Sequence, residues 1–275
     1  MIKNLIRTDH KDIVDCLHEA FSDYPLPTKM PYDYWKNRWH MAHLNTALSY
    51  GYFTEQRLKG FILHGIDEWG GEKCFYNMAT GVVPAYRRKG ILNALYEKAL
   101  IHASEASCAY GYLEVLCNNV KAIKAYEKSG FSIIDKADSF IVATDIQFDK
   151  TLQLQSPDKW QAEDYEHMIG HKLSFEHRSS VINRDQDSFS YYELNQDENL
   201  LAFATVKNSN HKVVQFGFLD RDIDRYGPSL FGQLSSKYSG LKIVNISEKD
   251  EALISFFKKH KFRNLISQYM MRVQL

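Results

Sequence analysis

The spacing of apolar and polar positions predicts a strand, a turn and a helix in the segment 75–100. Residues 75–83 are apolar or small enough for a buried strand, and Pro84 ends its pairing because proline has no N–H to donate. Residues 91–100 carry apolar side chains at helical spacing among good helix formers. The loop between this strand and this helix contains Arg87, Arg88, Lys89 and Gly90.

This loop has the chemistry of a phosphate-binding turn. The first amides of a helix lack an internal acceptor and lie at the positive end of the helix dipole, so the N–H groups of residues 88–92 can hold a pyrophosphate. Gly90 lets the backbone approach a ligand closely, and the flanking cations strengthen the attraction. A solvated basic turn is the alternative interpretation while the segment is taken alone.

A second strand and helix follow the first pair. The segment GYLEVL at 111–116 alternates as a strand does, and Asn118 and Asn119 end it. Residues 120–128 then form a short helix, which Gly130 closes as a C-terminal cap. The order strand, helix, strand, helix fits a parallel strand pair in an α/β layer, and such layers bind ligands at the carboxyl ends of their strands.

The two segments together resemble the GCN5-related N-acetyltransferase (GNAT) superfamily. The acetyl-CoA loop of that family has Val, Pro, Gln or Arg, Gly and a small residue at fixed spacing, and the chain has at these places Val82, Pro84, Arg87, Gly90 and Leu92. The second motif of the family is matched by Leu113, Val115, Asn119, Ala122, Tyr126, Glu127, Lys128, Gly130 and Phe131. The resemblance covers residues 1–145. Leu92 departs from the family pattern, and it would crowd a pyrophosphate unless its side chain turned into the helix packing.

The resemblance implies an α/β fold in which helices flank a central mixed, twisted sheet. It implies that acetyl-CoA is the cosubstrate and that acetyl passes to a primary amine by direct attack in a ternary complex, with a small molecule or a peptide as acceptor. A non-catalytic acyl-CoA-binding or regulatory module is the alternative function. The residues that the resemblance assigns to acetyl-CoA binding are Val82, Arg87, Arg88, Lys89, Gly90, Ile91, Leu92 and Asn119.

Amide formation from a thioester needs a group that protonates the departing thiolate and a group that accepts the proton of the amine. The motif position makes Tyr126 the candidate acid, because a phenol stays protonated at neutral pH; a packed helix aromatic is the alternative. Glu114 is the candidate base, by resemblance to ribosomal-protein alanine acetyltransferases, and an exposed strand carboxylate is the alternative. Asn77 and Thr80 can bind a substrate but cannot act as a strong base.

The acceptor is expected to lie against the N-terminal segment, because the first two helices of the family cover the substrate side. Aromatic rings with nearby carboxylates would suit a cationic amine, whereas packing in the core is the alternative for these rings. The residues concerned are Phe21, Tyr24, Tyr34, Trp35 and Trp39, with Asp23 and Asp33.

The second half of the chain repeats the pattern of the first half. A shift of 131 residues brings Phe131 onto Phe262, and the apolar positions of the preceding strand and helix then coincide without a gap. A chance match of two amphipathic units is the alternative. We therefore predict two tandem copies of the fold, with domains at residues 1–147 and 153–275.

The second copy lacks the residues that the resemblance assigns to chemistry. Phe257 stands in the place of Tyr126, and Asp250 in the place of Asn119. The segment that corresponds to the phosphate loop contains Asp220, Asp222 and Asp224. These carboxylates would repel a pyrophosphate, so we predict that the second copy does not bind acetyl-CoA. Packing, completion of the acceptor cleft and a homodimer interface stay open as its roles.

Composition narrows the class of protein. The 275 residues are enough for two domains, and the 34 basic and 34 acidic residues balance, without the basic excess of a nucleic-acid-binding protein. Acidic residues near the start and the lack of long apolar runs argue against a secretion signal or a membrane span, so we expect a cytoplasmic protein. We expect the four cysteines to be reduced, and we assign no metal although His40 and His43 form an HxxH pair.

Overall fold

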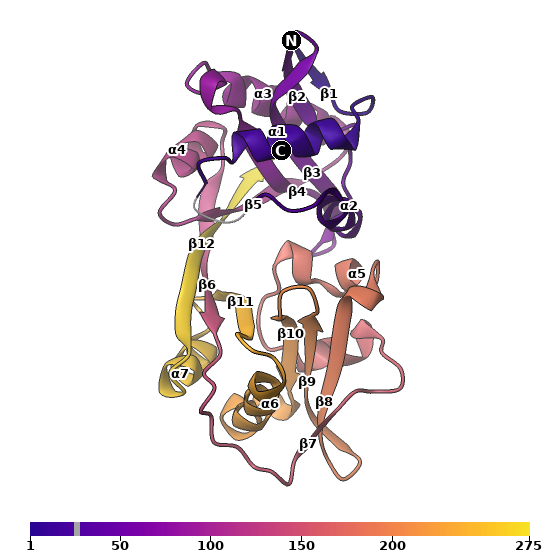
Figure 1. Ribbon diagram of the computed structural model, residues 1–275, viewed down its shortest axis with the longest axis vertical. Helices are drawn as coiled ribbons and strands as arrows, with labels where there is room; N and C mark the ends of the chain where they lie inside the picture. The colour runs from indigo at the N-terminus through magenta and orange to yellow at the C-terminus, as the bar shows by residue number, and fades with distance from the viewer. Residues whose placement is uncertain (25–27) are drawn as a thin grey trace. The chain divides into compact units, whose positions relative to one another are not determined.

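The computed structural model describes residues 1–24 and 28–275, and it divides the chain into two compact units (Figure 1). The first unit contains Met1–Ile134 and Tyr269–Leu275, and the second contains Asp135–Gln268. Among the described residues, no helix has the length and the apolar composition that a membrane crossing requires.

The end of the chain belongs to the first unit. The Leu275 amide donates to the Ala109 carbonyl oxygen at 3.1 Å, and both residues lie in that unit. The compact units therefore differ from the domain limits inferred from the sequence, 1–147 and 153–275. The compact units are defined by contacts within the structure, whereas the predicted limits are defined by a repeated sequence pattern. As limits of the repeat, 1–147 and 153–275 stay a prediction.

The first unit is built on a mixed sheet with helices on both faces. Its elements are β1 (Ile2–Asn4), α1 (His10–Ala20), α2 (Tyr32–Met41), β2 (Tyr50–Thr54), β3 (Arg57–Trp69), β4 (Glu72–Val82), α3 (Ile91–Glu105), β5 (Tyr110–Leu116) and α4 (Val120–Lys128). The strands pair in the order β1-β2-β3-β4-β5, and only the β4 and β5 pair is parallel. Alternation along β3 separates the faces: Phe61 contacts Phe21 beyond the end of α1, whereas Ile62 joins the core that contains Tyr96 of α3. The predicted α/β sheet with flanking helices is confirmed.

The parallel strands β4 and β5 pair over only part of their length. Their register runs from Cys74 opposite Tyr110 to Asn77 opposite Leu113 and then stops, although β4 continues to Val82. Beyond this point β4 leads toward α3, and β5 leads to α4. The N-termini of both helices thus follow the carboxyl ends of neighbouring parallel strands, which is where α/β sheets bind their ligands.

The second unit repeats this order of strands and helices. Its elements are β7 (Gln153–Gln155), α5 (Ser179–Ile182), β8 (Phe189–Gln196), β9 (Asn199–Lys207), β10 (Lys212–Phe218), α6 (Ile223–Lys237), β11 (Lys242–Ser247) and α7 (Glu251–Lys259), with parts of β6 (Ser132–Ile141) and β12 (Arg263–Gln274). Strands β8, β9 and β10 are antiparallel neighbours, and β10 pairs with β11 in parallel. The parallel pair is followed by α7 as β5 is followed by α4.

Hydrogen bonds at the ends of α4 and α7 recur at the predicted spacing. The Asn119 amide donates to Leu116 at 2.9 Å, and 131 residues later the Asp250 amide donates to Ser247 at 3.1 Å. After the helices, the Phe131 amide donates to the Tyr126 carbonyl oxygen at 3.1 Å. The corresponding bond from Phe262 to Phe257 measures 2.8 Å. The predicted internal repeat is confirmed in backbone detail at this point of the fold.

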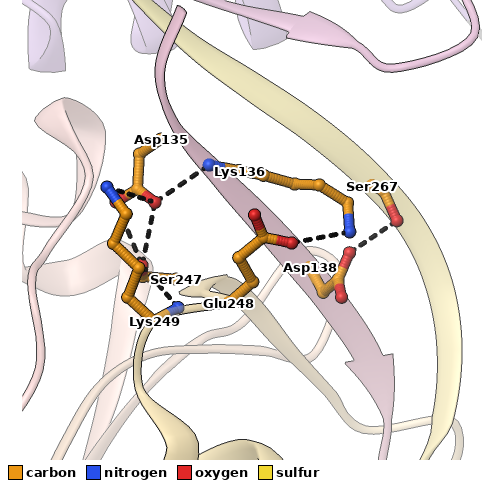
Figure 2. Close-up of polar contacts among 7 residues, drawn as sticks. All are labelled: Asp135, Lys136, Asp138, Ser247, Glu248, Lys249 and Ser267. Carbon is orange, nitrogen blue, oxygen red and sulfur yellow. Dashed lines mark hydrogen bonds and ion pairs between the residues drawn. The ribbon is translucent and has the colours of Figure 1, made fainter.

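A polar network joins β6 to the end of β11 in the second unit (Figure 2). The Asp135 carboxylate accepts from the Ser247 hydroxyl at 3.0 Å and from the Lys136 amide at 2.9 Å, and Lys249 Nζ lies 3.8 Å away. The Asp135 side chain is only 10% exposed, whereas the neighbouring Lys136 to Glu248 ion pair of 2.9 Å is half-exposed. Asp135 is therefore the buried centre of this network.

We expect Asp135→Ala to lower the free energy of unfolding by about 1–3 kcal/mol, because it leaves the Ser247 hydroxyl and the Lys136 amide without their acceptor. Glu248→Ala removes the exposed ion pair alone and is the matched control, with an expected loss of at most about 1 kcal/mol. Urea unfolding of both variants measures the difference. Equal losses would show that Asp135 does not carry the network.

Candidate active site

The loop before α3 ends in a left-handed glycine. Gly90 has φ 74° and ψ 1° at the N-cap of α3, and no side chain caps this helix. A Cβ atom added at Gly90 would meet nothing within 4 Å, so the conformation and not the space requires glycine there. Arg88 also has a positive φ, 62°. The backbone thus turns sharply before the helix begins.

The first amides of α3 are left without acceptors. In the described part of the chain, the N–H groups of residues 90–93 have no hydrogen-bond partner, and the Ala94 amide is the first to donate into the helix, to Gly90 at 3.1 Å. Four free amides at the positive end of a 15-residue helix have an arrangement that can bind an anion. The predicted phosphate loop therefore has the required geometry.

The three cations of this loop have different surroundings. The Arg87 guanidinium donates to both carboxylate oxygens of Asp23, at 2.6 and 2.7 Å, and to the carbonyl oxygens of Ala20 and Val82 at 2.7 and 3.0 Å. Its hydrogen bonds hold the pKa of Asp23 below the ordinary value. Arg87 thus ties the end of α1 to the loop. Arg88 and Lys89 are exposed, and Lys89 Nζ lies 5.0 Å from the Tyr86 ring centre.

The side chains after Gly90 turn into the fold. Ile91 is 6% exposed and belongs to the core of the first unit, and the half-buried Leu92 packs against the same core. The Leu92 side chain therefore packs with the helix, which is the orientation that would keep it from crowding a pyrophosphate. Val82, at the end of β4, contributes its carbonyl oxygen to Arg87.

Tyr126 lies buried on α4 among aromatic rings. Its ring is 5.9 Å from the ring of Tyr96 at 90°, and 6.1 Å from that of Phe131. Burial raises the pKa of Tyr126 to about 12, and a hydrogen bond with the Thr80 hydroxyl opposes this rise. The phenol therefore stays protonated at neutral pH, as a proton donor must. The acid role itself stays a prediction.

Asn119 caps α4 and contacts an N-terminal aromatic residue. Its Oδ1 accepts from the Ala122 amide at 3.3 Å, and its side chain forms a hydrogen bond with Tyr24. Burial raises the pKa of Tyr24, and the bond to Asn119 opposes that rise. Trp35 and Trp39 are 6% and 3% exposed, so they are core residues and do not line an open surface for the acceptor. Tyr24, one of the predicted acceptor-side aromatic residues, therefore lies beside a motif residue.

A polar cluster beside Tyr126 joins Asn77 and Thr80 of β4 to Tyr96 of α3. The three side chains form hydrogen bonds with one another, and Tyr96 is 1% exposed. The sequence names Asn77 and Thr80 as binding candidates only, and it gives no signal for Tyr96, which occupies an apolar position of an amphipathic helix. This cluster is the part of the site that the motifs do not contain.

Glu114 lies on β5 between Leu113 and Val115. These neighbours are 1% and 5% exposed and point into the core, so alternation turns Glu114 to the opposite face, where it is half-buried. This agrees with the predicted orientation, and its role as base stays a prediction.

All four cysteines are free thiols, and burial raises the pKa of Cys16 to about 12. Residues 1–24 and 28–275 contain no group of three or more side chains suited to hold a metal ion.

The second unit fills the corresponding positions with its own side chains. Asp222 caps α6 and accepts from the Arg225 amide at 3.1 Å, so a carboxylate occupies the helix N-terminus that is free in α3. Phe257, in the place of Tyr126, is fully buried and has no polar atom to offer. Asp250 caps α7 as Asn119 caps α4, so this residue keeps a folding role in both units.

Comparison with known proteins finds a family match within the first unit. Residues 12–131 match the acetyltransferase (GNAT) family. No curated protein matches the sequence. A tandem GNAT protein from the clavulanic acid biosynthesis pathway is similar in structure, with a TM-score of 0.75 and 12% identity over 100% of this chain and 98% of that chain.

Two further solved structures share the fold. A GCN5-related N-acetyltransferase from Sphaerobacter thermophilus has a TM-score of 0.70 and 9% identity over 100% of this chain and 95% of its own. Another, from Anabaena variabilis ATCC 29413, has a TM-score of 0.63 and 15% identity over 99% of this chain and 72% of its own. At such identities these structures establish the fold, and the tandem protein shows that two GNAT units occur in one chain of this architecture.

Proposed function

We propose that the first unit, whose residues 12–131 match the acetyltransferase (GNAT) family, transfers an acetyl group from acetyl-CoA to a primary amine. The observation that supports this most is the N-terminus of α3, where the amides of residues 90–93 are free after a left-handed glycine. A pyrophosphate would satisfy these amides, and the exposed Arg88 and Lys89 would add attraction.

The proposed reaction is direct attack of the amine on the thioester carbonyl in a ternary complex. Acetyl-CoA supplies a thioester whose sulfur leaves as a thiolate. Tyr126 is protonated and donates its phenolic proton to that sulfur, and Glu114 accepts the proton of the amine through water. Most of the rate would come from holding amine and thioester together, which converts a bimolecular step into an effectively unimolecular one.

The test of this function is a panel of amines with acetyl-CoA and a readout of free thiol. Small amines, amino acids and peptides with free N-termini make up the panel, because the acceptor side is not identified by its residues. Thiol release that depends on one class of amine supports transfer. Binding of acetyl-CoA without thiol release for any amine would favour the non-catalytic module instead.

We expect one molecule of acetyl-CoA to bind per chain. The N-terminus of α3 is free, whereas Asp222 occupies that of α6 and carries the charge of a repelling anion. Isothermal titration calorimetry of the full chain measures the stoichiometry. Two equivalents per chain would contradict the view that the second unit has lost the cofactor site.

A further inference from the structure

A bulge in β4 places two polar side chains on one face of the strand. Asn77 and Thr80 are three residues apart, which in a regular strand would put them on opposite faces. The register shifts at Met78, so that Asn77 pairs with His64 and Thr80 with Ile62. These partners are two residues apart on β3 and share a face, so Asn77 and Thr80 share it too. Both therefore face the core that contains Tyr96.

The hydrogen bonds of this cluster leave the proton of the Thr80 hydroxyl with a choice of acceptor. Asn77 Nδ2 donates to Thr80 Oγ1 at 2.7 Å and to the phenol oxygen of Tyr96. Tyr96 is then an acceptor toward Asn77, and its oxygen lies 3.2 Å from Thr80 Oγ1, a contact in which either hydroxyl can donate. When Tyr96 is the donor, Thr80 Oγ1 accepts two bonds, and its own proton can go to Asn77 Oδ1, at 3.0 Å, or to Tyr126.

We propose that Asn77 and Tyr96 hold the Thr80 hydroxyl in place so that it donates a hydrogen bond to the oxygen of Tyr126 as Tyr126 gives up its proton. This rests on the proposed function. In that step the Tyr126 O–H bond breaks, an S–H bond forms on the thiolate, and the electron pair stays on the phenol oxygen. The Thr80 proton stays on Thr80, and the proton lost by the amine later restores Tyr126 through solvent.

The chemistry of the phenol explains why such a donor matters. Burial raises the pKa of Tyr126 to about 12, whereas a thiol has an ordinary pKa of about 8.5. A proton moving from this phenol to a thiolate therefore moves against its intrinsic preference. A hydrogen bond that Thr80 donates to the phenolate reduces this cost, in agreement with its lowering effect on the pKa of Tyr126. Asn77, Thr80 and Tyr96 act here as positioning residues.

Three variants test the proposal by the separation of kcat from KM. Thr80→Val is expected to lower kcat about tenfold with little change in the KM for acetyl-CoA, because it removes one charge-assisted hydrogen bond. Thr80→Ser keeps the hydroxyl and should restore most of the rate. Tyr96→Phe should also lower kcat, as Thr80→Val does. Tyr50→Phe is the matched control, since Tyr50 is 5% exposed in the same core and contacts His102 instead of the cluster.

A double-mutant cycle separates this proposal from the proposed function. In a Tyr126→Phe background, Thr80→Val should cause no further loss of kcat, because Thr80 acts through Tyr126. A second tenfold loss in that background would overturn the proposal while the acid role of Tyr126 stood. The proposal would also be overturned if kcat fell strongly in Tyr126→Phe but stayed unchanged in both Thr80→Val and Tyr96→Phe. Failure of the unaltered protein to acetylate any amine would instead overturn the proposed function.

Discussion

Tyr126→Phe is expected to lower kcat about 100-fold while the affinity for acetyl-CoA stays the same. General acids contribute roughly 10²–10⁴-fold, and the lower end applies because the raised pKa of Tyr126 makes it a weak acid. The substitution keeps the ring, which packs against Tyr96 and Phe131, and removes only the hydroxyl. Phe257 occupies the same place in the second unit, fully buried, so the fold accepts phenylalanine there.

Steady-state rates with thiol detection and calorimetry with acetyl-CoA measure the two quantities separately. Because the pKa of Tyr126 is about 12, the phenol stays protonated up to about pH 10, and the pH profile of Tyr126→Phe should keep the shape of the unaltered protein in this range. Tyr50→Phe serves as the control for loss of a buried phenol. Unchanged turnover in Tyr126→Phe would remove this residue from the mechanism.

The sequence predicts the parts of the site that are local in the chain. The helix over residues 120–128 has those limits in the structure, because Asn119 caps it and Gly130 ends it with φ 91°. The strand and the basic loop before α3 are also found where apolar pattern and proline place them. Each of these features depends on neighbours within a few residues, which is the range over which propensity and capping act.

The features that the sequence does not reveal join residues far apart. The sequence predicts that Arg87 binds phosphate. In the structure its guanidinium binds Asp23, 64 residues earlier, and no local sequence pattern predicts that pairing. Tyr96 has the spacing of a core residue, and its hydrogen bonds with Asn77 and Thr80 depend on the bulge at Met78. A one-residue shift of register changes which face a side chain takes, and single-sequence patterns do not fix such shifts.

The return of the chain end to the first unit is a third feature of this kind. Residues 269–275 alternate as an ordinary strand, and the pattern alone does not choose a partner for it. The repeat suggests that they belong with the second copy, because they follow its helix in the same order. In the structure these residues pack with the first compact unit, as the bond from Leu275 to Ala109 shows, and the limits of the repeat stay a prediction. Sequence patterns thus predict elements more securely than the partners of strands.

Arg88→Glu is expected to weaken acetyl-CoA binding about 30-fold. The change removes one positive charge and adds a negative one beside the free amides of α3, where the pyrophosphate is proposed to lie. Because Arg88 is exposed, the dielectric of water applies, and two unit changes of charge at about 4 Å then amount to about 2 kcal/mol, which corresponds to about 30-fold in affinity. Because Arg88 is exposed, the loss should shrink as the salt concentration rises.

Arg221→Glu is the matched control for this charge reversal. Arg221 ends the short 3₁₀ helix Leu219–Arg221 before α6 and also has a positive φ, 58° against 62° for Arg88, so both substitutions make the same change of charge at a positive-φ position. Asp222 caps α6, and we expect no change in acetyl-CoA affinity when Arg221 is replaced. Calorimetry at low and high salt on both variants measures the effect. Equal affinity for Arg88→Glu and the unaltered protein would refute the phosphate loop, and equal losses in both variants would mean that net charge, and not a site at α3, attracts the ligand.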